Sequence, residues 1–396
     1  MSAAKTRRVL SLSTLFPNAA HPRFGIFVAK SLEALQRGTH WDVTLVNPIG
    51  LPPLALGRYR ALAAAAQDGH EFGFAVHRPV FRLLPKVGGR LNPKLIAKAV
   101  LPLARRLHAE TPFDLVDAQF FYPDGPAAMM IARELDLPFS VKARGADIHL
   151  WGARGYGREA LLETAREAAG VLAVCETLAE DMATLGMARE AIAVHYTGLD
   201  RDLFRPMDHV GLRARLAENF AIPIAGDDLL LVTVGALIER KGQAYVIKAL
   251  ADLPRARLLL VGKGEDEASL RMLAKEVGVA DRVHFLGGVD PSMLPPLLSA
   301  ADAMVLPSAS EGLANAWIEA LACGTPLVIT DAGGAREVVT APEAGVIVAR
   351  NCRAIREGIE LVTARPRSPQ AVAATVERFS WAANGAALAA YYDGLV

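Results

Sequence analysis

The sequence lacks the features of a disulfide-rich or membrane-spanning protein. Its 396 residues include three cysteines that lie far apart and form no CxxC pair, Cys175, Cys323 and Cys352. An odd number of scattered cysteines favours reduced, buried thiols over disulfides. No apolar run reaches the roughly 20 residues of a bilayer-spanning helix, and the basic start leads into a predicted strand rather than a signal peptide. We therefore expect a cytoplasmic protein, either soluble or bound peripherally at the inner face of the membrane.

The chain also lacks an overall charge. Its 43 lysines and arginines nearly balance 42 aspartates and glutamates, for a formal net charge of +1, so the composition gives no basis for a nucleic-acid partner. One segment, residues 72–109, has no acid and eight basic residues: Arg78, Arg82, Lys86, Arg90, Lys94, Lys98, Arg105 and Arg106. On a helix over residues 94–108 several of these cations share a face opposite an apolar stripe. The pattern fits either a solvated basic face or a surface, from Arg78 to Arg106, that contacts anionic lipid.

Length and the order of predicted elements indicate two α/β domains. A chain of 396 residues exceeds the usual size of one domain, and strand-like runs alternate with helix-like runs, which predicts parallel sheets with crossover helices. The predicted strands form two sets: 9–16, 43–47, 115–119, 139–143 and 171–175, then 229–235, 257–262, 283–286, 303–307 and 327–330. Residues 198–208, rich in charge and proline, are the predicted linker between two doubly wound units.

Two glutamates mark the most informative stretch, between a predicted strand and the following helix. Seven residues separate Glu311 from Glu319, which places them roughly 8–12 Å apart along one segment, given a helical rise of about 1.5 Å per residue. Glycosidase carboxylates instead face each other across one anomeric centre at roughly 5–9.5 Å. The pair therefore suits the two ends of a long ligand such as a nucleotide-sugar.

Two cations stand at the start of another predicted helix. Arg240 and Lys241 follow the strand that ends at Gly235 and precede the helix that opens with Gln243. The helix dipole disfavours basic residues at this position, so their presence needs another reason, and with free helix-start amides they form a site suited to a diphosphate. A solvated helix start is the alternative interpretation.

These motifs, in this order and spacing, resemble the retaining GT-B glycosyltransferases of family 4, in which the two glutamates form the EX7E motif. The likeness runs nearly end to end and also takes in residues 16–18, 25–28, 122–125, 143–148, 197–200, 235–242 and 262–264. It implies two doubly wound Rossmann-like domains facing a central cleft: an acceptor-binding domain (residues 1–205) and a nucleotide-sugar-binding domain (residues 206–378). It also implies that a last helix, residues 379–396, crosses back to the N-terminal domain.

The resemblance implies a role for each candidate residue. Glu311 would hydrogen-bond the donor sugar and stabilise charge at its anomeric carbon, while Arg240 and Lys241 would stabilise the departing diphosphate; these three are the expected catalytic residues. Glu319 would accept hydrogen bonds from the ribose. The other expected donor-binding residues are Gly25, Arg144, Asp147, Gly262, Gly264, Val289, Gly312, Leu313, Ala314 and Asn315.

Three positions depart from the family's pattern. Arg144 stands where many relatives carry a histidine that donates to the donor sugar, Ala236 where many carry arginine, and Thr197 where asparagine is common. Either Arg144 takes the histidine's role with a permanent charge, or nearby His149 does, or the sugar differs, for instance by carrying a carboxylate. For His149 an ordinary core or surface position is the preferred interpretation.

The expected reaction moves a sugar from a UDP- or GDP-linked donor to a hydroxyl of a glycan or lipid-linked saccharide, in cell-surface polysaccharide synthesis. The donor is a co-substrate, and neither a metal nor an organic cofactor is expected, because acids and histidines lack ligand spacing. The alternatives are a GT-B epimerase or phosphorylase, or a non-catalytic nucleotide-binding protein. A phosphorylase would need a pyridoxal-bearing lysine, and none stands in a recognisable context.

Overall fold

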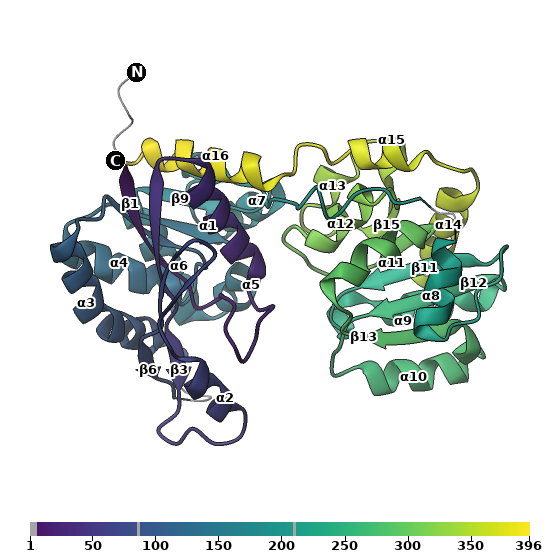
Figure 1. Cartoon of the computed structure of the whole chain (residues 1–396), viewed down its shortest axis with the longest axis horizontal. Coiled ribbons are helices and arrows are strands. Elements are labelled where there is room, and N and C mark those ends of the chain that lie inside the picture. Colours follow the sequence, from purple (N-terminus) through teal and green to yellow (C-terminus); the bar gives the residue numbers. More distant parts are fainter. Residues whose placement is uncertain (1–5, 85–87, 209–210) are drawn as a thin grey trace. The chain divides into compact units, whose positions relative to one another are not determined.

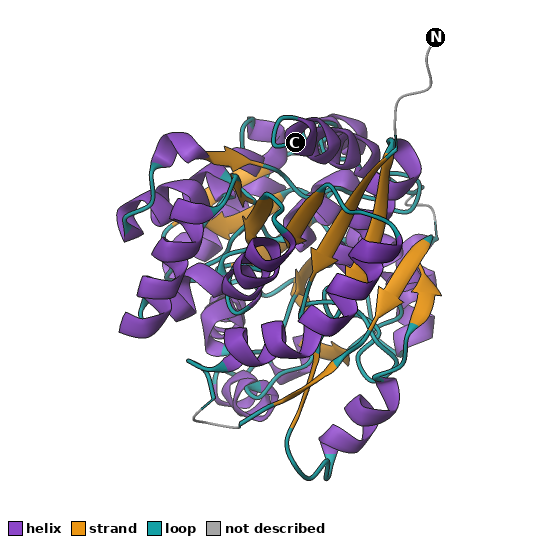
Figure 2. Ribbon diagram, turned by 90° about the vertical axis from the view of Figure 1, so that its left-hand side faces the viewer, coloured by secondary structure: helices purple, strands orange, loops and turns teal. Residues whose placement is uncertain are grey.

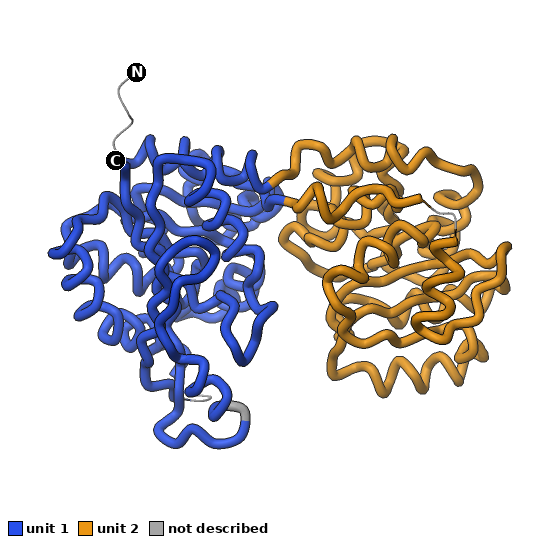
Figure 3. The backbone as a smooth tube through the Cα atoms, viewed as in Figure 1, with its two compact units in different colours: residues 1–198, 381–396 blue, residues 199–380 orange. Residues whose placement is uncertain are grey.

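The structure is a computed structural model that describes residues 6–84, 88–208 and 211–396. The chain folds into two compact units (Figure 3): unit 1 comprises Met1–Gly198 with Trp381–Val396, and unit 2 comprises Leu199–Ser380. The predicted domain limits at residues 205 and 378 lie near the observed divisions at residues 198 and 380. None of the helices in the described ranges is long and apolar enough to cross a membrane.

A mostly parallel sheet forms the centre of unit 1. Its strand order is β10-β9-β8-β7-β1-β2-β5-β4, and the pair β4–β5 is antiparallel. The strands are β1 (Arg7–Leu12), β2 (Trp41–Val46), β4 (Gly69–Glu71), β5 (Phe74–His77), β7 (Leu115–Ala118), β8 (Phe139–Ala143), β9 (Gly170–Ala173) and β10 (Ile192–Val194). The chain winds one way from β1 and the other way from β7, so β1 and β7 flank the point where strand order reverses. Open α/β sheets bind ligands at the carboxyl ends of such strands.

Helices flank the strands of unit 1 (Figures 1 and 2), and a short parallel pair, β3 (Ile49–Leu51) with β6 (Val80–Arg82), lies beside the main sheet. The helices are α1 (Ile26–Gly38), α2 (Arg58–Ala65), α3 (Asn92–Glu110), α4 (Asp124–Leu135), α5 (Ala146–Gly152), α6 (Gly155–Glu167), α7 (Glu176–Leu185), the 3-10 turn η1 (Arg189–Ala191) and α16 (Trp381–Asp393).

The C-terminal helix α16 packs on unit 1, against α1. Tyr392 is fully buried and its ring meets that of Trp41 edge-on at 5.3 Å between centroids. Polar contacts anchor the helix as well, since Asn384 Oδ1 accepts from Ser31 Oγ at 2.7 Å. The predicted return of the last helix to the N-terminal domain is thus confirmed, and it rests on a buried aromatic pair that sequence periodicity did not reveal.

Unit 2 has a six-stranded parallel sheet in the order β13-β12-β11-β14-β15-β16. Its strands are β11 (Leu229–Val234), β12 (Ala256–Val261), β13 (Val283–Gly287), β14 (Ala303–Leu306), β15 (Leu327–Thr330) and β16 (Gly345–Val348). Counted within the unit this is the 3-2-1-4-5-6 order of a Rossmann fold, in which strand order reverses between β11 and β14. The predicted fold class, two Rossmann-like α/β units, is therefore confirmed.

The helices of unit 2 connect these strands. They are α8 (Leu212–Phe220), α9 (Gln243–Ala249), α10 (Glu267–Glu276), α11 (Leu294–Ala300), α12 (Asn315–Ala322), α13 (Ala335–Val338), α14 (Cys352–Thr363) and α15 (Pro369–Ala374), with 3-10 turns η2 (Glu239–Lys241), η3 (Leu250–Asp252), η4 (Ala280–Arg282), η5 (Pro291–Met293) and η6 (Pro342–Ala344). Leucines and valines of β11, β12 and β14 form a core with α9 and α14.

The acid-free segment is less uniform than its composition suggests. Arg78 is buried, and its guanidinium pairs with Glu71 at 2.7 Å. The prediction that Arg78 forms one end of a basic surface is therefore wrong. Its partner Glu71 lies just outside the acid-free segment in the sequence but contacts Arg78 in the fold. Lys86 lies outside the described residues. The exposed cations Lys94 and Lys98 lie on α3, whose opposite face buries Ile96, Ala97, Val100 and Ala104.

Candidate active site

The predicted catalytic residues of unit 2 come together at the reversal point of its sheet. Arg240 and Lys241 lie on η2, in the loop that leaves β11, and Glu311 lies in the loop that leaves β14. β11 and β14 are neighbours in the sheet, so the two loops meet at its carboxyl edge. This is the part of a Rossmann fold at which a nucleotide binds.

Glu311 is ion-paired with both cations. Its Oε1 accepts from Lys241 Nζ, and its Oε2 lies 3.4 Å from Arg240 Nη1. The side chain of Glu311 is 8% exposed and that of Lys241 is 13% exposed, whereas Arg240 is 46% exposed. The lysine is therefore shielded from water, which strengthens its electrostatic interactions, while the arginine can reach a ligand from the rim.

Main-chain contacts fix these two loops against each other. Ala309 N donates to Arg240 O at 2.7 Å, and the guanidinium of Arg350 donates to Pro307 O at 2.9 Å and to Glu239 O at 2.8 Å. Arg350 thus bridges the loop after β11 and the loop after β14. No sequence motif marks this residue, because its bridging contacts are to carbonyl groups and it lies after the last strand, far from every motif.

Two glycines, Gly262 and Gly264, form a backbone ledge without side chains next to these loops. Gly262 follows β12 with φ +145°, and a Cβ there would lie 1.9 Å from Gly235 O. A Cβ at Gly264 would lie 2.0 Å from Leu237 O. Only glycine fits at either position, because the turns after β11 and β12 pack backbone against backbone. Val289 is buried, and its contact with a donor stays a prediction.

The remaining candidates of unit 2 lie at the start of α12. The stretch Gly312, Leu313, Ala314 and Asn315 leads into this helix, and its N-cap residue, Ala314, provides no side-chain cap. The first amides of α12 are therefore left for another acceptor. Gly312 O accepts from Gly334 N at 2.8 Å, which holds the stretch against the loop after β15.

Glu319, on α12, differs from Glu311 in its surroundings. In the described part of the chain its carboxylate has no ion pair or hydrogen bond, and burial raises its pKa to about 7. A largely buried carboxyl group without a protein partner is ready to accept hydrogen bonds from a ligand. The contact with ribose hydroxyls stays a prediction.

The candidates of unit 1 gather at the carboxyl end of β8. Asp147 is buried, and its carboxylate accepts from the main-chain amides of Phe121 at 2.8 Å, Gly145 at 2.8 Å and Arg144 at 3.0 Å. With its oxygens occupied in this way, Asp147 shapes the turn that presents Arg144. Its direct contact with a donor stays a prediction.

Arg144 itself is held by neighbours from other elements. Nε donates to Gln119 O and Nη2 to Gln119 Oε1, both at 2.6 Å, and the guanidinium lies 4.9 Å from the ring centre of Phe27. Burial lowers the pKa of Arg144 to about 10, so the side chain keeps its charge at neutral pH. Gly25, which precedes α1 with φ +70°, packs against Leu15 O and sets the start of the helix that carries Phe27.

His149 has an acidic partner of its own. Its Nε2 lies 2.9 Å from Asp181 Oδ2, and both side chains are partly exposed. This contact fits the preferred interpretation of an ordinary surface histidine. No sequence motif indicates the buried pair near Arg144, in which Lys142 Nζ lies 2.5 Å from His195 Nδ1; burial lowers the pKa of both groups.

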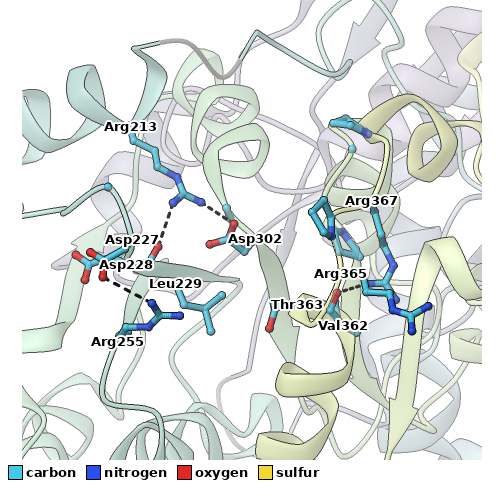
Figure 4. A pocket seen from close by; sticks show the side chains of 16 residues that line it. Arg213, Asp227, Asp228, Leu229, Arg255, Asp302, Val362, Thr363, Arg365 and Arg367 are labelled. Carbon is cyan, nitrogen blue, oxygen red and sulfur yellow. Dashed lines mark hydrogen bonds and ion pairs between the residues drawn. The ribbon is translucent and has the colours of Figure 1, made fainter.

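A separate cavity of about 530 Å³ lies at the opposite, amino-terminal edge of the unit 2 sheet. Figure 4 shows the charged side chains that line it, among them Arg213, which donates to Asp302 Oδ1 at 2.7 Å and to Asp228 O at 3.0 Å. None of the predicted site residues lines this cavity. Its paired charges brace the amino ends of the strands. In the described ranges no group of three or more histidine, cysteine or acidic side chains could hold a metal ion.

Family models match both units. The model described as Glycosyltransferase Family 4 matches residues 25–203, and the model described as Glycosyl transferases group 1 matches residues 215–378. The two matches lie one after the other and cover most of the chain.

Known relatives agree with these matches. A putative teichuronic acid biosynthesis glycosyltransferase of Bacillus subtilis, TuaC, is 26% identical over 363 residues, which are 89% of this chain and 88% of TuaC. A GDP-mannose-dependent alpha-(1-6)-phosphatidylinositol monomannoside mannosyltransferase of Mycolicibacterium smegmatis is 32% identical over 214 residues, 50% of this chain and 55% of that enzyme.

Solved structures share the fold. A sucrose-phosphate synthase from Thermosynechococcus elongatus superposes with a TM-score of 0.78 at 20% identity and covers 98% of this chain and 99% of its own. HepE of Anabaena, solved in complex with UDP and glucose, superposes with a TM-score of 0.70 at 20% identity, over 97% of this chain and 99% of its own. At this identity the likeness is one of architecture.

Proposed function

The chain belongs to the GT-B glycosyltransferases of family 4, and we propose that it moves a sugar from a UDP- or GDP-linked donor to a hydroxyl of a glycan or lipid-linked saccharide, with retention of configuration. The observation that carries this proposal is the meeting of Arg240, Lys241 and Glu311 at the reversal point of the unit 2 sheet. A nucleoside diphosphate fits that place because cations and uncapped helix-start amides lie together there.

In the proposed reaction the bond between the anomeric carbon and the diphosphate breaks, and a bond from that carbon to the acceptor oxygen forms. The acceptor's proton passes to an oxygen of the leaving diphosphate. Arg240 and Lys241 stabilise the negative charge that grows on the diphosphate, which is the electrostatic contribution that usually dominates catalysis. Glu311 stabilises positive charge on the sugar. The proposal needs no metal ion, because the cationic side chains supply the counter-charge.

The donor is proposed to carry uridine or guanosine. UDP is bound by the structural neighbour HepE, and GDP-mannose is the donor named for the mycobacterial relative. The name of TuaC, a putative enzyme of teichuronic acid biosynthesis, supports a role in the synthesis of a cell-surface polysaccharide.

A donor panel tests the proposal. The purified chain is mixed with UDP-glucose, UDP-glucuronate, GDP-mannose and GDP-mannuronate, and thermal unfolding and release of nucleoside diphosphate are followed. A donor at 100 times its Kd adds about 2.7 kcal/mol to stability, and slow hydrolysis without acceptor distinguishes an enzyme from a binding protein. If none of the four raises the unfolding temperature or releases diphosphate, the proposal is wrong.

We further propose that unit 1 meets an anionic membrane surface through α3 and the segment around α2. Lys94 and Lys98 are exposed on α3, and Leu54 and Leu56, just before α2, are 75% and 60% exposed. Exposed cations together with exposed apolar side chains are typical of proteins that lie on anionic lipid. Such contact would bring the enzyme to a lipid-linked acceptor at the inner face of the membrane.

Liposome co-sedimentation tests this surface. Binding should rise with the fraction of anionic lipid, fall with salt, and weaken at least severalfold in a Lys94→Glu, Lys98→Glu double variant. Lys275→Glu, on an exposed position of α10 in unit 2, is the control and should bind as the wild type does. Equal binding to neutral vesicles would count against the surface.

A further inference from the structure

We propose that Arg144 forms a subsite for the carboxylate of an acidic sugar at the carboxyl end of the unit 1 sheet. The inference rests on the proposed function, which makes the substrates sugars. Arg144 directly follows β8, and Gln119 directly follows β7, a strand that borders the reversal point of this sheet. Both residues therefore lie at the edge where an open α/β sheet binds its ligand.

The guanidinium is held in one orientation before any ligand arrives. Gln119 occupies Nε and Nη2 through its backbone and side-chain oxygens, each at 2.6 Å. Phe27 of α1 lies against the guanidinium, 4.9 Å from ring centre to Cζ. Residues from two other parts of the unit thus fix the side chain, so that little side-chain entropy remains to be lost when a ligand binds.

Part of the guanidinium is left for a ligand. Arginine has five N–H donors, and the two contacts with Gln119 use two of them. Among the described residues Nη1 has no hydrogen-bond partner, and it is not one of the buried atoms that lack a partner. Arg144 is only partly buried, and Nη1 keeps some exposure, so it is able to donate to an oxyanion.

No acid of the described chain forms an ion pair with Arg144. The two nearby carboxylates already accept from neutral donors: Asp147 from main-chain amides such as Gly145 N at 2.8 Å, and Asp117 from Ser11 Oγ at 3.0 Å and Ser140 Oγ at 2.8 Å. They stabilise the charge of Arg144 only through space. The guanidinium donors that Gln119 leaves are therefore not occupied by an acid and remain for an anionic ligand.

The charge of the site favours a carboxylate over a phosphate. The nearest other basic groups, Lys142 and His195, are buried and contact each other at 2.5 Å, so neither is available to a ligand. Asp147 and Asp117 place negative charge near Arg144, so they repel a phosphate dianion more strongly than a singly charged carboxylate, which a guanidinium can hold with paired hydrogen bonds. A phosphate dianion would need a second cation.

Calorimetric titration of the full-length chain tests the subsite. The ligands are two matched pairs, UDP-glucose with UDP-glucuronate and GDP-mannose with GDP-mannuronate, and two probes without nucleotide, sodium glucuronate and inorganic phosphate. We expect the wild type to prefer the acidic member of one pair, and Arg144→Gln to reduce that preference on the order of 10-fold or more. Arg144→Lys, which keeps the positive charge but lacks the planar guanidinium, should retain part of this preference. Arg133→Gln, at an exposed ion pair on α4, should leave the ratio unchanged.

The remaining outcomes are equally decisive. If Arg144→Gln weakens only the binding of free glucuronate, the subsite exists but receives the carboxylate of the acceptor instead of that of the donor. If no glucuronate or mannuronate ligand responds to Arg144→Gln or Arg144→Lys, or if phosphate binds more tightly than glucuronate at Arg144, the inference is overturned. If no nucleotide-sugar binds the wild type, the proposed function fails, and the glucuronate probe still reports on Arg144 by itself.

Discussion

Lys241 Nζ and Glu311 Oε1 form an ion pair between the loops that leave β11 and β14. The pair is largely shielded from water, with side chains that are 13% and 8% exposed. The glutamate therefore pairs with the cation that the proposed function assigns to the diphosphate. Donor binding would exchange one anionic partner of Lys241 for another. Substitution of Glu311 and of Lys241 should therefore change the affinity for a nucleoside diphosphate in opposite directions.

Glu311→Gln should separate nucleotide binding from catalysis. Loss of the carboxylate frees Lys241 and Arg240 for a diphosphate, so we expect the affinity for the nucleoside diphosphate alone to rise severalfold. Transfer should fall by about 10² to 10³, because charge on the sugar is no longer stabilised. Calorimetry and steady-state kinetics measure the two effects. Glu357→Gln, which removes an exposed glutamate of α14, is the control and should change neither.

Lys241→Ala should lower both quantities. Without the shielded cation, the diphosphate loses its strongest counter-charge, and transfer should fall by about 10² to 10³. Affinity for the free nucleoside diphosphate should fall as well, opposite to the effect of Glu311→Gln. Lys248→Ala, on an exposed position of α9, provides the matched control. Turnover near the wild-type value in Lys241→Ala would remove that residue from the mechanism.

Much of the fold was predictable because the strands of parallel sheets are apolar and appear in the sequence as continuous apolar runs. The predicted strands at residues 229–235 and 327–330 correspond to β11 and β15. The short strands β3, β4, β6 and β10 were missed, since three residues each are too few for a periodic signal. The four-residue strand β5 was missed as well. β16, which carries a glycine at its start, was also missed.

The candidate site was predictable only in part, for a physical reason. Motifs placed Arg240, Lys241 and Glu311 correctly on loops after strands, but not their pairing, which depends on the adjacency of β11 and β14. Contacts to carbonyl groups leave no trace in sequence, so the bracing by Arg350 and the fixing of Arg144 by Gln119 were not foreseen. Burial of Arg78 was missed because its partner acid lies outside the acid-free run.

Donor affinity should depend on pH through Glu319. Burial raises the pKa of this carboxyl to about 7, and hydrogen bonds from ligand hydroxyls favour its ionised form and lower that pKa in the complex. Binding is therefore linked to proton release: affinity should rise with pH up to about 7 and then level off. In Glu319→Gln this part of the pH dependence should disappear. Titrations between pH 5.5 and pH 8.5 measure it, and an unchanged slope in the variant would contradict the ribose contact.

Asp124→Asn should alter the pH dependence of stability. Asp124 begins α4 and accepts from Thr14 N and Thr14 Oγ1, both at 2.8 Å; burial raises its pKa from 3.8 to about 7. Because the folded pKa lies above the unfolded one, the stability from the protonated form is complete below pH 3.8 and is lost as the pH rises through 7. At pH 8 the variant should gain on the order of 1–4 kcal/mol relative to the wild type.

Urea unfolding of the wild type and Asp124→Asn at pH 5 and pH 8 measures this difference. The gain should be clearly larger at pH 8 than at pH 5, since Asp124 is then ionised in the wild type. Glu319 contributes to the same pH window, so a Glu319→Gln background separates the two groups. An equal gain at both pH values would mean that Asp124 stays ionised or is hydrated in the fold.

Gly262→Ala should disrupt the ledge beside the catalytic loops. A methyl group there would lie 1.9 Å from Gly235 O, on a backbone with φ +145° that alanine rarely adopts. The contact is with backbone and cannot be relieved by a rotamer change, so we expect a loss of about 3 kcal/mol or more together with loss of nucleoside diphosphate binding. Gly226→Ala is the matched control, because no atom lies within 4 Å of its added methyl group. If urea midpoints and binding are the same in both variants, the turns after β11 and β12 are not packed as closely as the structure requires.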